Sequence, residues 1–282
     1  MGPSRVLHLM NPLRHDFIAS CLADTHPLHT PEAQTPNPGL NYLDIGCGGG
    51  IFAESLARTI PTSTREGKEE GGYKPSTRAA SITALDPSPT LIKIARDHAR
   101  LDPVVEKHLV DGRFRYLNCS VEDHLSQVSS SSTSSDAPSE AAKKYDLVTL
   151  FEVLEHIDPT SSSPLSFLTT CLRLLRPGGW LIGSTIARSL PSFIVNQVIA
   201  EAPWPIGVVP RGTHEWGKFV NPDELRSWAV EGLERARVED GAGRQGEEWK
   251  CDGVMYFPGC GWKMVNGSEG WGNYFWGVRR GF

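Results

Sequence analysis

The 282-residue sequence predicts a doubly wound, Rossmann-like α/β fold with a mostly parallel sheet. Two observations predict this class. Short apolar runs alternate with segments of helical periodicity, and the first apolar run ends in a glycine-rich turn. Parallel strands joined by right-handed helical crossovers end at one edge of their sheet. A ligand is therefore expected beyond the carboxyl ends of the strands.

The expected strands and helices alternate along the chain. The apolar run LNYLDI predicts a buried strand at 40–45, and the spacing of Phe52, Leu56 and Ile60 predicts a helix at 52–60. Arg-Pro-Gly-Gly at 176–179 is expected to end a later helix, because proline lacks a backbone donor and glycine is frequent at helix ends. Further strands are expected at 81–85, 114–119, 145–151 and 180–184, and further helices at 89–101 and 166–175.

Two polar stretches interrupt this alternation, at 61–80 and 126–143. The second is rich in serine and too polar to bury enough surface to offset the entropy of ordering it. Both are expected to be solvated loops inserted in a single domain that spans 1–282. The apolar fraction of 39% is sufficient for one large core.

Composition narrows the class of function. The net charge of −5 gives no basic face for nucleic acid, so a nucleic-acid partner is not expected. No run approaches the roughly 18–20 apolar residues that span a bilayer. The six cysteines form no CxxC pair and no zinc spacing, which is typical of reduced intracellular thiols. The opening residues MGPSRVLHLMNPLRHDFI show no apolar core of a signal peptide.

The turn after the first expected strand reads Asp44-Ile-Gly46-Cys-Gly48-Gly-Gly. Glycines there let the backbone approach a ligand closely. Read from Gly48, GGGIFA also satisfies the dinucleotide pattern GxGxxA, but Asp44 at the strand end would repel a pyrophosphate. Asp44 suits a cationic ligand, directly or through the turn. Asp86 ends the second strand, where a carboxylate can accept both hydroxyls of a ribose. This pattern resembles the class I S-adenosylmethionine (SAM) methyltransferases.

The fourth strand runs into Phe151-Glu152-Val-Leu-Glu155-His156. If a helical turn starts there, Glu152, Glu155 and His156 lie at i, i+3 and i+4 on one face. Two carboxylates and an imidazole suit a divalent cation, Mg²⁺, Mn²⁺ or Zn²⁺. In the alternative interpretation no metal binds, and His156 is a general base or a structural residue.

Several longer segments are similar to the ubiquinone-biosynthesis O-methyltransferases, of the eukaryotic mitochondrial type. They are NPLRHDFI (11–18), LDIGCGGGIFAESLAR (43–58), FEVLEHI (151–157), LLRPGGWLIGSTIAR (174–188), VPRGTHEWGKFVNPDEL (209–225) and the tail DGVMYFPGCGWKMVNGSEGWGNYFWGVRR (252–280). The resemblance omits the two insertions and 226–251, where EDGAGRQGEEW looks like a solvent loop. GTHEWGKF and the tail are its most specific parts.

The resemblance implies methyl transfer from SAM to a catechol-type hydroxyl of polyprenylated ubiquinone precursors, namely a polyprenyl-dihydroxybenzoate and the demethylated ubiquinol. It implies a requirement for a divalent cation, most simply Mg²⁺. It also implies that the protein acts on the matrix side of the mitochondrial inner membrane, within a multi-protein complex. SAM contacts carry over to Arg14, Gly46, Asp86 and Phe151, and the metal triad, which is also the catalytic set, carries over to Glu152, Glu155 and His156.

The segment 189–220 is expected to cover the site and to contact the membrane. Phe193, Ile194, Val198 and Ile199 form an apolar stripe, and Arg211, His214, Trp216 and Lys218 form an aromatic and basic rim typical of a lipid boundary. The alternative is a lid that packs only on its own domain.

Three other functions stay open. A methyltransferase of another small molecule should lack GTHEWGKF. A non-catalytic SAM-fold subunit should have lost Asp86 or the glycines. A nicotinamide-dependent oxidoreductase would require the glycine pattern GxGxxA that is read from Gly48.

Overall fold

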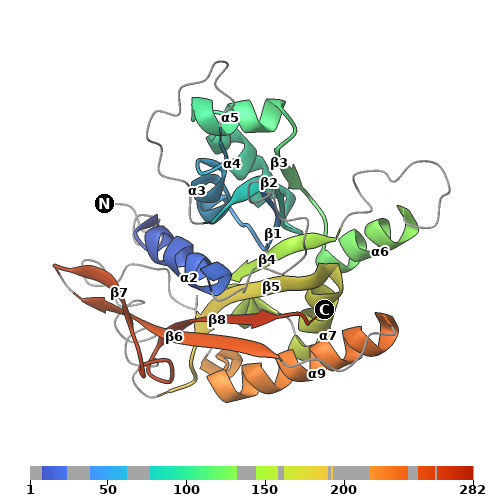
Figure 1. The fold of residues 1–282 in the computed structure, drawn as a ribbon. Helices are drawn as coiled ribbons and strands as arrows, with labels where there is room; N and C mark the ends of the chain where they lie inside the picture. The colour runs from blue at the N-terminus through green and yellow to red at the C-terminus, as the bar shows by residue number, and fades with distance from the viewer. Residues whose placement is uncertain are drawn as a thin grey trace.

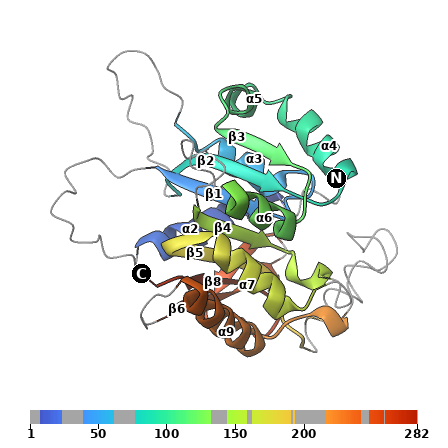
Figure 2. The ribbon, with the colours of Figure 1, turned by 90° about the vertical axis from the view of Figure 1, so that its right-hand side faces the viewer.

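The computed structural model describes residues 8–23, 39–61, 77–131, 144–157, 162–189, 192, 216–240, 247–257 and 259–281. These residues contain one eight-stranded sheet of order β3-β2-β1-β4-β5-β8-β6-β7, with helices on both faces (Figures 1 and 2). The predicted fold class is confirmed. Among the described residues, no helix is long and apolar enough to cross a membrane.

Five strands form the parallel part of the sheet. Pairs β3-β2, β2-β1, β1-β4 and β4-β5 are all parallel, so these strands end at one edge. In register, Asp44 lies level with Ala84 on one side and Thr149 on the other. The strands are β1 (Leu40–Ile45), β2 (Ala79–Leu85), β3 (Phe114–Leu117), β4 (Tyr145–Phe151) and β5 (Leu175–Ile186).

Three antiparallel strands extend the sheet beyond β5. The last strand in sequence, β8 (Asn273–Arg279), inserts between β5 and β6 (Glu248–Phe257), and β7 (Gly261–Val265) forms the outer edge. The pairs β5-β8, β8-β6 and β6-β7 are antiparallel. Consequently β6 runs in the same direction as β5, and its carboxyl end faces the edge at which a ligand is expected.

The helices divide between two hydrophobic clusters, one on each face of the sheet. The first cluster includes residues of α2 (Asn11–Ala23), α3 (Ile51–Ala57), α4 (Pro89–Ala99) and α5 (Pro103–Val110). The second includes residues of α6 (Val121–Ser131), α7 (Pro164–Leu174) and α9 (Pro222–Asp240), which Figure 2 shows in front of the sheet. Two short 3-10 turns, η2 (Leu154–His156) and η4 (Trp216–Lys218), complete the described elements.

Local sequence explains where several helices begin. α4, α5 and α7 each start with proline at the first position, after a capping side chain from Ser88, Asp102 or Ser163. Each cap accepts a hydrogen bond from a backbone N–H of the first turn that would otherwise lack a partner. Neither α5 nor α6 was expected from the sequence, because neither has a long apolar stripe.

The insertion boundaries differ from those expected. β2 includes Ala79 and Ala80, and α6 continues through 126–131, with Val128 buried in the second cluster. The prediction of a loop was therefore wrong for 79–80 and for 126–131. Packing in the folded domain overrides the locally polar composition of these stretches. The remainder of both stretches, 62–76 and 132–143, lies outside the described residues.

The tail and the segment before it also differ. In the stretch 239–249, the first two residues end α9 and the last two begin β6, where Trp249 stacks on Trp276 at 6.2 Å between ring centroids. The prediction of a solvent loop was therefore wrong for residues 239–240 and 248–249. β5 already begins at Leu175, so the Arg-Pro-Gly-Gly stretch belongs to a strand.

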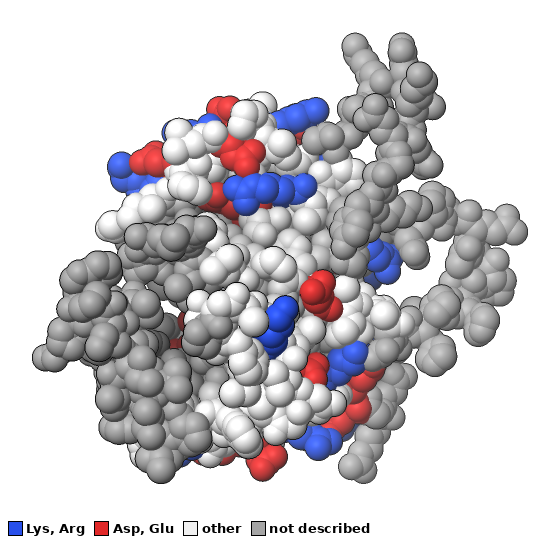
Figure 3. Space-filling view, turned by 90° about the vertical axis from the view of Figure 1, so that its left-hand side faces the viewer, with Lys and Arg blue, Asp and Glu red and all other residues white. Residues whose placement is uncertain are grey.

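Most of the expected lid, including the apolar stripe, lies outside the described residues. Within 189–220, Phe219 and Val220 are buried, whereas Trp216 is exposed and donates its indole N–H to the Ser189 carbonyl at 3.3 Å. From the side toward which β6 and β7 project, charged side chains form an upper and a lower group, and Lys or Arg and Asp or Glu side chains are also visible between them (Figure 3).

Candidate functional site

The glycine turn joins β1 to α3 at the carboxyl edge of the sheet. Gly46, Gly48 and Gly50 all have positive φ, of 68°, 53° and 85°. The N–H groups of Gly46 and Cys47 donate to the Leu85 carbonyl at 2.8 and 3.0 Å, which ties the turn to β2. A Cβ added to Gly48 would meet no atom within 4 Å, so the backbone is open on that side to a ligand.

Asp86 lies directly against this turn. Its Oδ2 accepts the Gly48 N–H at 3.0 Å, and its Oδ1 accepts the Ser88 N–H at 2.8 Å. Because each carboxylate oxygen has two acceptor positions, both oxygens keep one for a hydroxyl donor. The glycine turn and Asp86, which the sequence assigns to one ligand, are thus in direct contact.

Asp44 is buried behind the turn. Its Oδ1 accepts a hydrogen bond from Thr149 Oγ1 at 2.7 Å. Burial raises the pKa of Asp44 to about 7, against the opposing effects of the Thr149 hydrogen bond and the Arg14 charge. This position favours an action through the turn over direct contact with a ligand.

Arg14 connects α2 to the end of β4. One guanidinium nitrogen donates to Asn11 Oδ1 at 3.0 Å, and another donates to Glu152 Oε1 at 2.9 Å. The guanidinium lies 5.0 Å from the ring centroid of Phe151 and 6.0 Å from that of Phe52. Phe151 and Phe52 contact each other edge to face, so the charge of Arg14 is held over aromatic faces.

The predicted single-face arrangement of Glu152, Glu155 and His156 was wrong. Glu152 has a left-handed φ of 59° and stands outside the short turn Leu154–His156, so no regular helix spans the three residues. Glu155 is buried, Glu152 is partly exposed and His156 is exposed. Within the described part of the chain, no three His, Cys, Asp or Glu side chains converge as a metal-binding group.

Glu155 has a separate role in the packing. Its Oε2 accepts a hydrogen bond from Thr185 Oγ1 of β5 at 3.0 Å. Burial raises the pKa of Glu155 to about 7, and the nearby charge of Glu152 raises it further. Two carboxylates close together at the end of β4 are electrostatically unfavourable, and Arg14 offsets the charge of only one of them.

Comparison with known proteins identifies the family of this chain. A family model described as methyltransferase domain matches residues 15–232. Ubiquinone biosynthesis O-methyltransferase of Methylobacterium sp. is 35% identical over 79% of this chain and 71% of its own length. The chain belongs to the ubiquinone biosynthesis O-methyltransferase family.

Mitochondrial members of this family are similarly related but longer. The Schizosaccharomyces pombe protein is 34% identical over 82% of this chain, and the Rattus norvegicus protein is 34% identical over 80%. The chain spans 64% and 52% of their lengths, respectively. Among solved structures, the methyltransferase domain of bacterial CtHen1 covers 97% of the chain with 14% identity and a TM-score of 0.53, which supports the fold.

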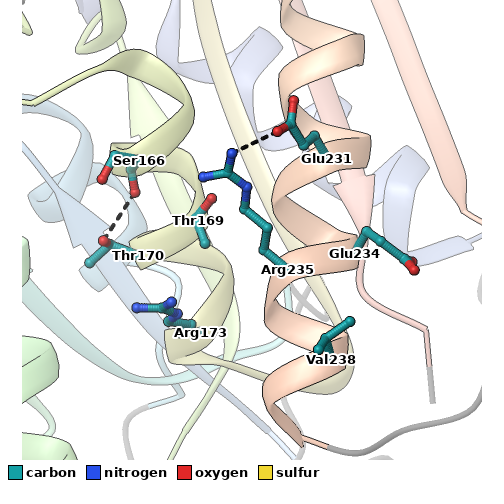
Figure 4. Close-up of a pocket in the computed structure, with 8 residues that line it drawn as sticks. All are labelled: Ser166, Thr169, Thr170, Arg173, Glu231, Glu234, Arg235 and Val238. Atoms are coloured by element: carbon teal, nitrogen blue, oxygen red, sulfur yellow. Dashed lines mark hydrogen bonds and ion pairs between the residues drawn. The ribbon is translucent and has the colours of Figure 1, made fainter.

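This member of the ubiquinone biosynthesis O-methyltransferase family also has a groove of about 510 Å³ that lies away from the predicted site residues. It opens between α7 and α9, and none of the predicted site residues lines it (Figure 4). An exposed ion pair between Arg235 and Glu231 crosses one side. The lining residues are Ser166, Thr169, Thr170, Arg173, Glu231, Glu234, Arg235 and Val238.

Three residues that support the site in this family member were not expected from the sequence. They are Asn11, Thr149 and Thr185, which hold Arg14, Asp44 and Glu155, respectively. Asn11 lies three residues before Arg14, so a helical reading of NPLR would place the two on one face. The sequence carries no signal for the threonines, because their partners lie in other elements, Asp44 in β1 and Glu155 in η2.

Proposed function

We propose that this chain transfers the methyl group of SAM to a catechol-type hydroxyl of polyprenylated ubiquinone precursors. The substrates are a polyprenyl-dihydroxybenzoate and the demethylated ubiquinol. Membership of the family supports this assignment. The observation that carries it is the contact between the Gly48 N–H and the Asp86 carboxylate, which joins the two parts of a nucleoside-binding edge.

The residues present fit SAM, which supplies a methyl group on a positively charged sulfur when bound. Asp86 accepts the ribose hydroxyls, and the open backbone at Gly48 allows close approach, whereas Gly46 gives the turn its tight packing against Val153. Asp44 provides a negative charge behind the turn for the cationic ligand. Arg14 and Phe151 close the side of the site at the end of β4.

Alignment is the main task of the enzyme in this proposal. Holding two reactants in line removes the entropic cost of bringing them together from solution. In the best cases this lowers the barrier by up to about 7–11 kcal/mol. A phenol with a pKa near 10 is a poor nucleophile at neutral pH, so its proton has to be removed. His156 is exposed at the carboxyl edge and is the proposed proton acceptor, with Glu152 and Glu155 positioned nearby.

The divalent cation remains a prediction. Glu152 forms an ion pair with Arg14, and Glu155 accepts a hydrogen bond from Thr185. The three expected ligands therefore do not fit a metal in the described arrangement. No step is therefore derived through a cation. Titration of Mg²⁺ by calorimetry against Glu152→Ala, Glu155→Ala and His156→Ala, with elemental analysis after chelation, tests for the site independently of turnover.

Location and partners complete the proposal. We place the chain on the matrix side of the mitochondrial inner membrane, peripherally attached through about 189–220 and within a multi-protein ubiquinone-biosynthesis complex. The mitochondrial relatives and the polyprenyl tail of the proposed substrate support this placement.

Turnover of a short-tailed catechol with SAM, followed by mass spectrometry with and without chelator, tests the function. We expect one methyl group per product molecule. Activity that survives exhaustive chelation would leave His156 as the base without a metal. Absence of methylation, together with thermal stabilisation by NAD but not by SAM, would favour the oxidoreductase alternative.

A further inference from the structure

The β6–β7 hairpin projects beyond the sheet on the side of the proposed site. Ile186, the last residue of β5, pairs with Asn273 of β8, and Asn273 pairs with Val254 of β6. Residues 255–257 therefore extend past the carboxyl end of β5. Phe151 of the site pairs with Ser184 near the same end. Figure 1 shows β6 and β7 reaching outward past the other strands.

The end of this hairpin exposes large apolar side chains. Tyr256 is 49% exposed, and Phe257 and Met264 are also exposed. Trp271, which is 59% exposed, precedes β8 at the same edge. We call these four residues the apolar tip. The hairpin sequence 253–265, GVMYFPGCGWKMV, contains one charged residue, the exposed Lys263.

Both faces of the hairpin carry this apolar surface. Tyr256 pairs in register with Trp262, and the rings meet edge to face at 5.4 Å. Since side chains alternate along a strand, Tyr256 and Met264 lie on one face, whereas Phe257 and Lys263 lie on the other. Trp262 packs against the first core cluster and anchors the hairpin to the domain.

This two-sided exposure discriminates between occupants. A flat protein surface would cover one face of the hairpin, whereas the boundary region of a bilayer surrounds a tip on both sides. Aromatic rings combined with lysine, in a segment without carboxylates, suit the phospholipid headgroup boundary. The edge strand β7 could instead pair with a second copy of the chain, but pairing in the plane of the sheet would leave the apolar side chains on both faces uncovered.

We propose that the apolar tip inserts into the surface of an anionic phospholipid bilayer, with Lys263 contacting lipid phosphate. This contact is additional to the one expected at 189–220. It rests on the proposed function in one respect, because a polyprenylated substrate has to enter the site from the membrane. The hairpin turns the carboxyl edge of the sheet, and therefore the site, toward the lipid.

Cys260 in the hairpin turn provides a local reporter. It is exposed, whereas the other five cysteines are buried or partly buried. A polarity-sensitive fluorophore on Cys260 of the full chain should shift to the blue with vesicles of phosphatidylcholine and phosphatidylglycerol, and less with phosphatidylcholine alone. Cys260→Ser gives the background labelling. A label on Leu101→Cys in that background should not respond, because Leu101 follows α4 at the opposite edge of the sheet.

Substitutions test the apolar tip directly. The double variant Phe257→Ser/Met264→Ser removes one apolar group from each face and should lower the vesicle partition coefficient at least about tenfold. Lys263→Gln should lower it roughly fivefold on anionic vesicles only. Leu101→Ser, at a residue 79% exposed, is the matched control and should leave partitioning unchanged.

The outcomes separate this inference from the proposed function. Vesicle binding without a response at Cys260, or equal partitioning of the double variant, would overturn the inference. A dimer by light scattering that the double variant abolishes, without vesicle binding, would show a second copy as the occupant and also overturn it. Methylation of a tail-less catechol, assayed on the same proteins, should be unchanged, and its absence in wild type would refute the function alone.

Discussion

Arg14 and Glu152, 138 positions apart in the sequence, form an ion pair at 2.9 Å. The sequence assigned these residues to different tasks, Arg14 to SAM and Glu152 to catalysis or a metal. The structure gives each the partner that offsets its charge. Glu152 therefore has to exchange this contact before it can serve a cation.

The ion pair should contribute measurably to stability. Arg14 is 4% exposed and Glu152 27%, so solvent screens the pair only in part. A double-mutant cycle of Arg14→Ala and Glu152→Gln, followed by urea unfolding, should give a coupling free energy of about 1 kcal/mol. The exposed Arg235–Glu231 pair is the control and should give about 0.3–0.5 kcal/mol. Equal couplings would contradict this prediction.

Asp86→Ala should reduce SAM affinity at least tenfold, because it removes charge-assisted hydrogen bonds worth roughly 1.5–3 kcal/mol. Calorimetry measures the affinity. Asp102→Ala is a matched control, since Asp102 also accepts two backbone N–H groups, at the start of α5. It should lower stability by about 1 kcal/mol and leave SAM affinity intact. Unchanged affinity in Asp86→Ala would refute the assignment.

SAM affinity should rise with pH up to about 7. Burial raises the pKa of Asp44 from 3.8 to about 7, so without ligand this carboxyl holds its proton through mildly acidic pH. A cationic ligand favours the ionised form, and binding should therefore release a proton below pH 7. Calorimetry in buffers of different ionisation enthalpy measures that release. Asp44→Asn should abolish it.

The same pKa affects the stability of the unliganded protein. Because the folded form binds this proton more tightly than the unfolded form, the contribution of Asp44 is favourable at low pH and is lost as pH rises from about 4 to 7. Asp44→Asn should consequently gain stability relative to wild type across that window. A constant difference in unfolding free energy would contradict the raised pKa.

Gly50→Ala should destabilise the glycine turn. Gly50 has a φ of 85°, and an added Cβ would clash with the Tyr116 hydroxyl. That hydroxyl is buried and has no hydrogen-bond partner among the described residues, so Tyr116→Phe alone should be nearly neutral. In the double variant, urea unfolding should show partial rescue, with about 1 kcal/mol of backbone strain remaining. No rescue would mean that the clash is not with Tyr116.

Shortening the serine-rich stretch should have two different effects. Replacing 132–143 by a short Gly/Ser linker should leave stability nearly unchanged, because loop entropy varies slowly with length. Replacing 126–143 also removes the last turns of α6 and the buried Val128, and should cost about 1–3 kcal/mol. Thermal unfolding distinguishes the two. Equal effects would show that 126–131 adds nothing to the core.

Local patterns predicted most of the sheet and the glycine turn. Strands at 40–45, 81–85 and 145–151 were found at or within two residues of their expected bounds, since short apolar runs between turn residues have few alternative structures. The helices α5 and α6 and the three carboxyl-terminal strands were not expected. Their residues pair with distant segments, and such pairing leaves little trace in local composition.

By itself, the sequence determined the family, the fold class and the residue types around the turn, because glycines and acidic strand ends act through local backbone geometry. Tertiary structure alone decided how the charges are paired. It buried Asp44 against Thr149, joined Arg14 to Glu152 and separated Glu152 from the turn that holds Glu155 and His156. It also placed the β6–β7 hairpin beside the site. These relationships depend on strand order and register, which bring together residues that are distant in the chain and therefore leave no periodic signal in it.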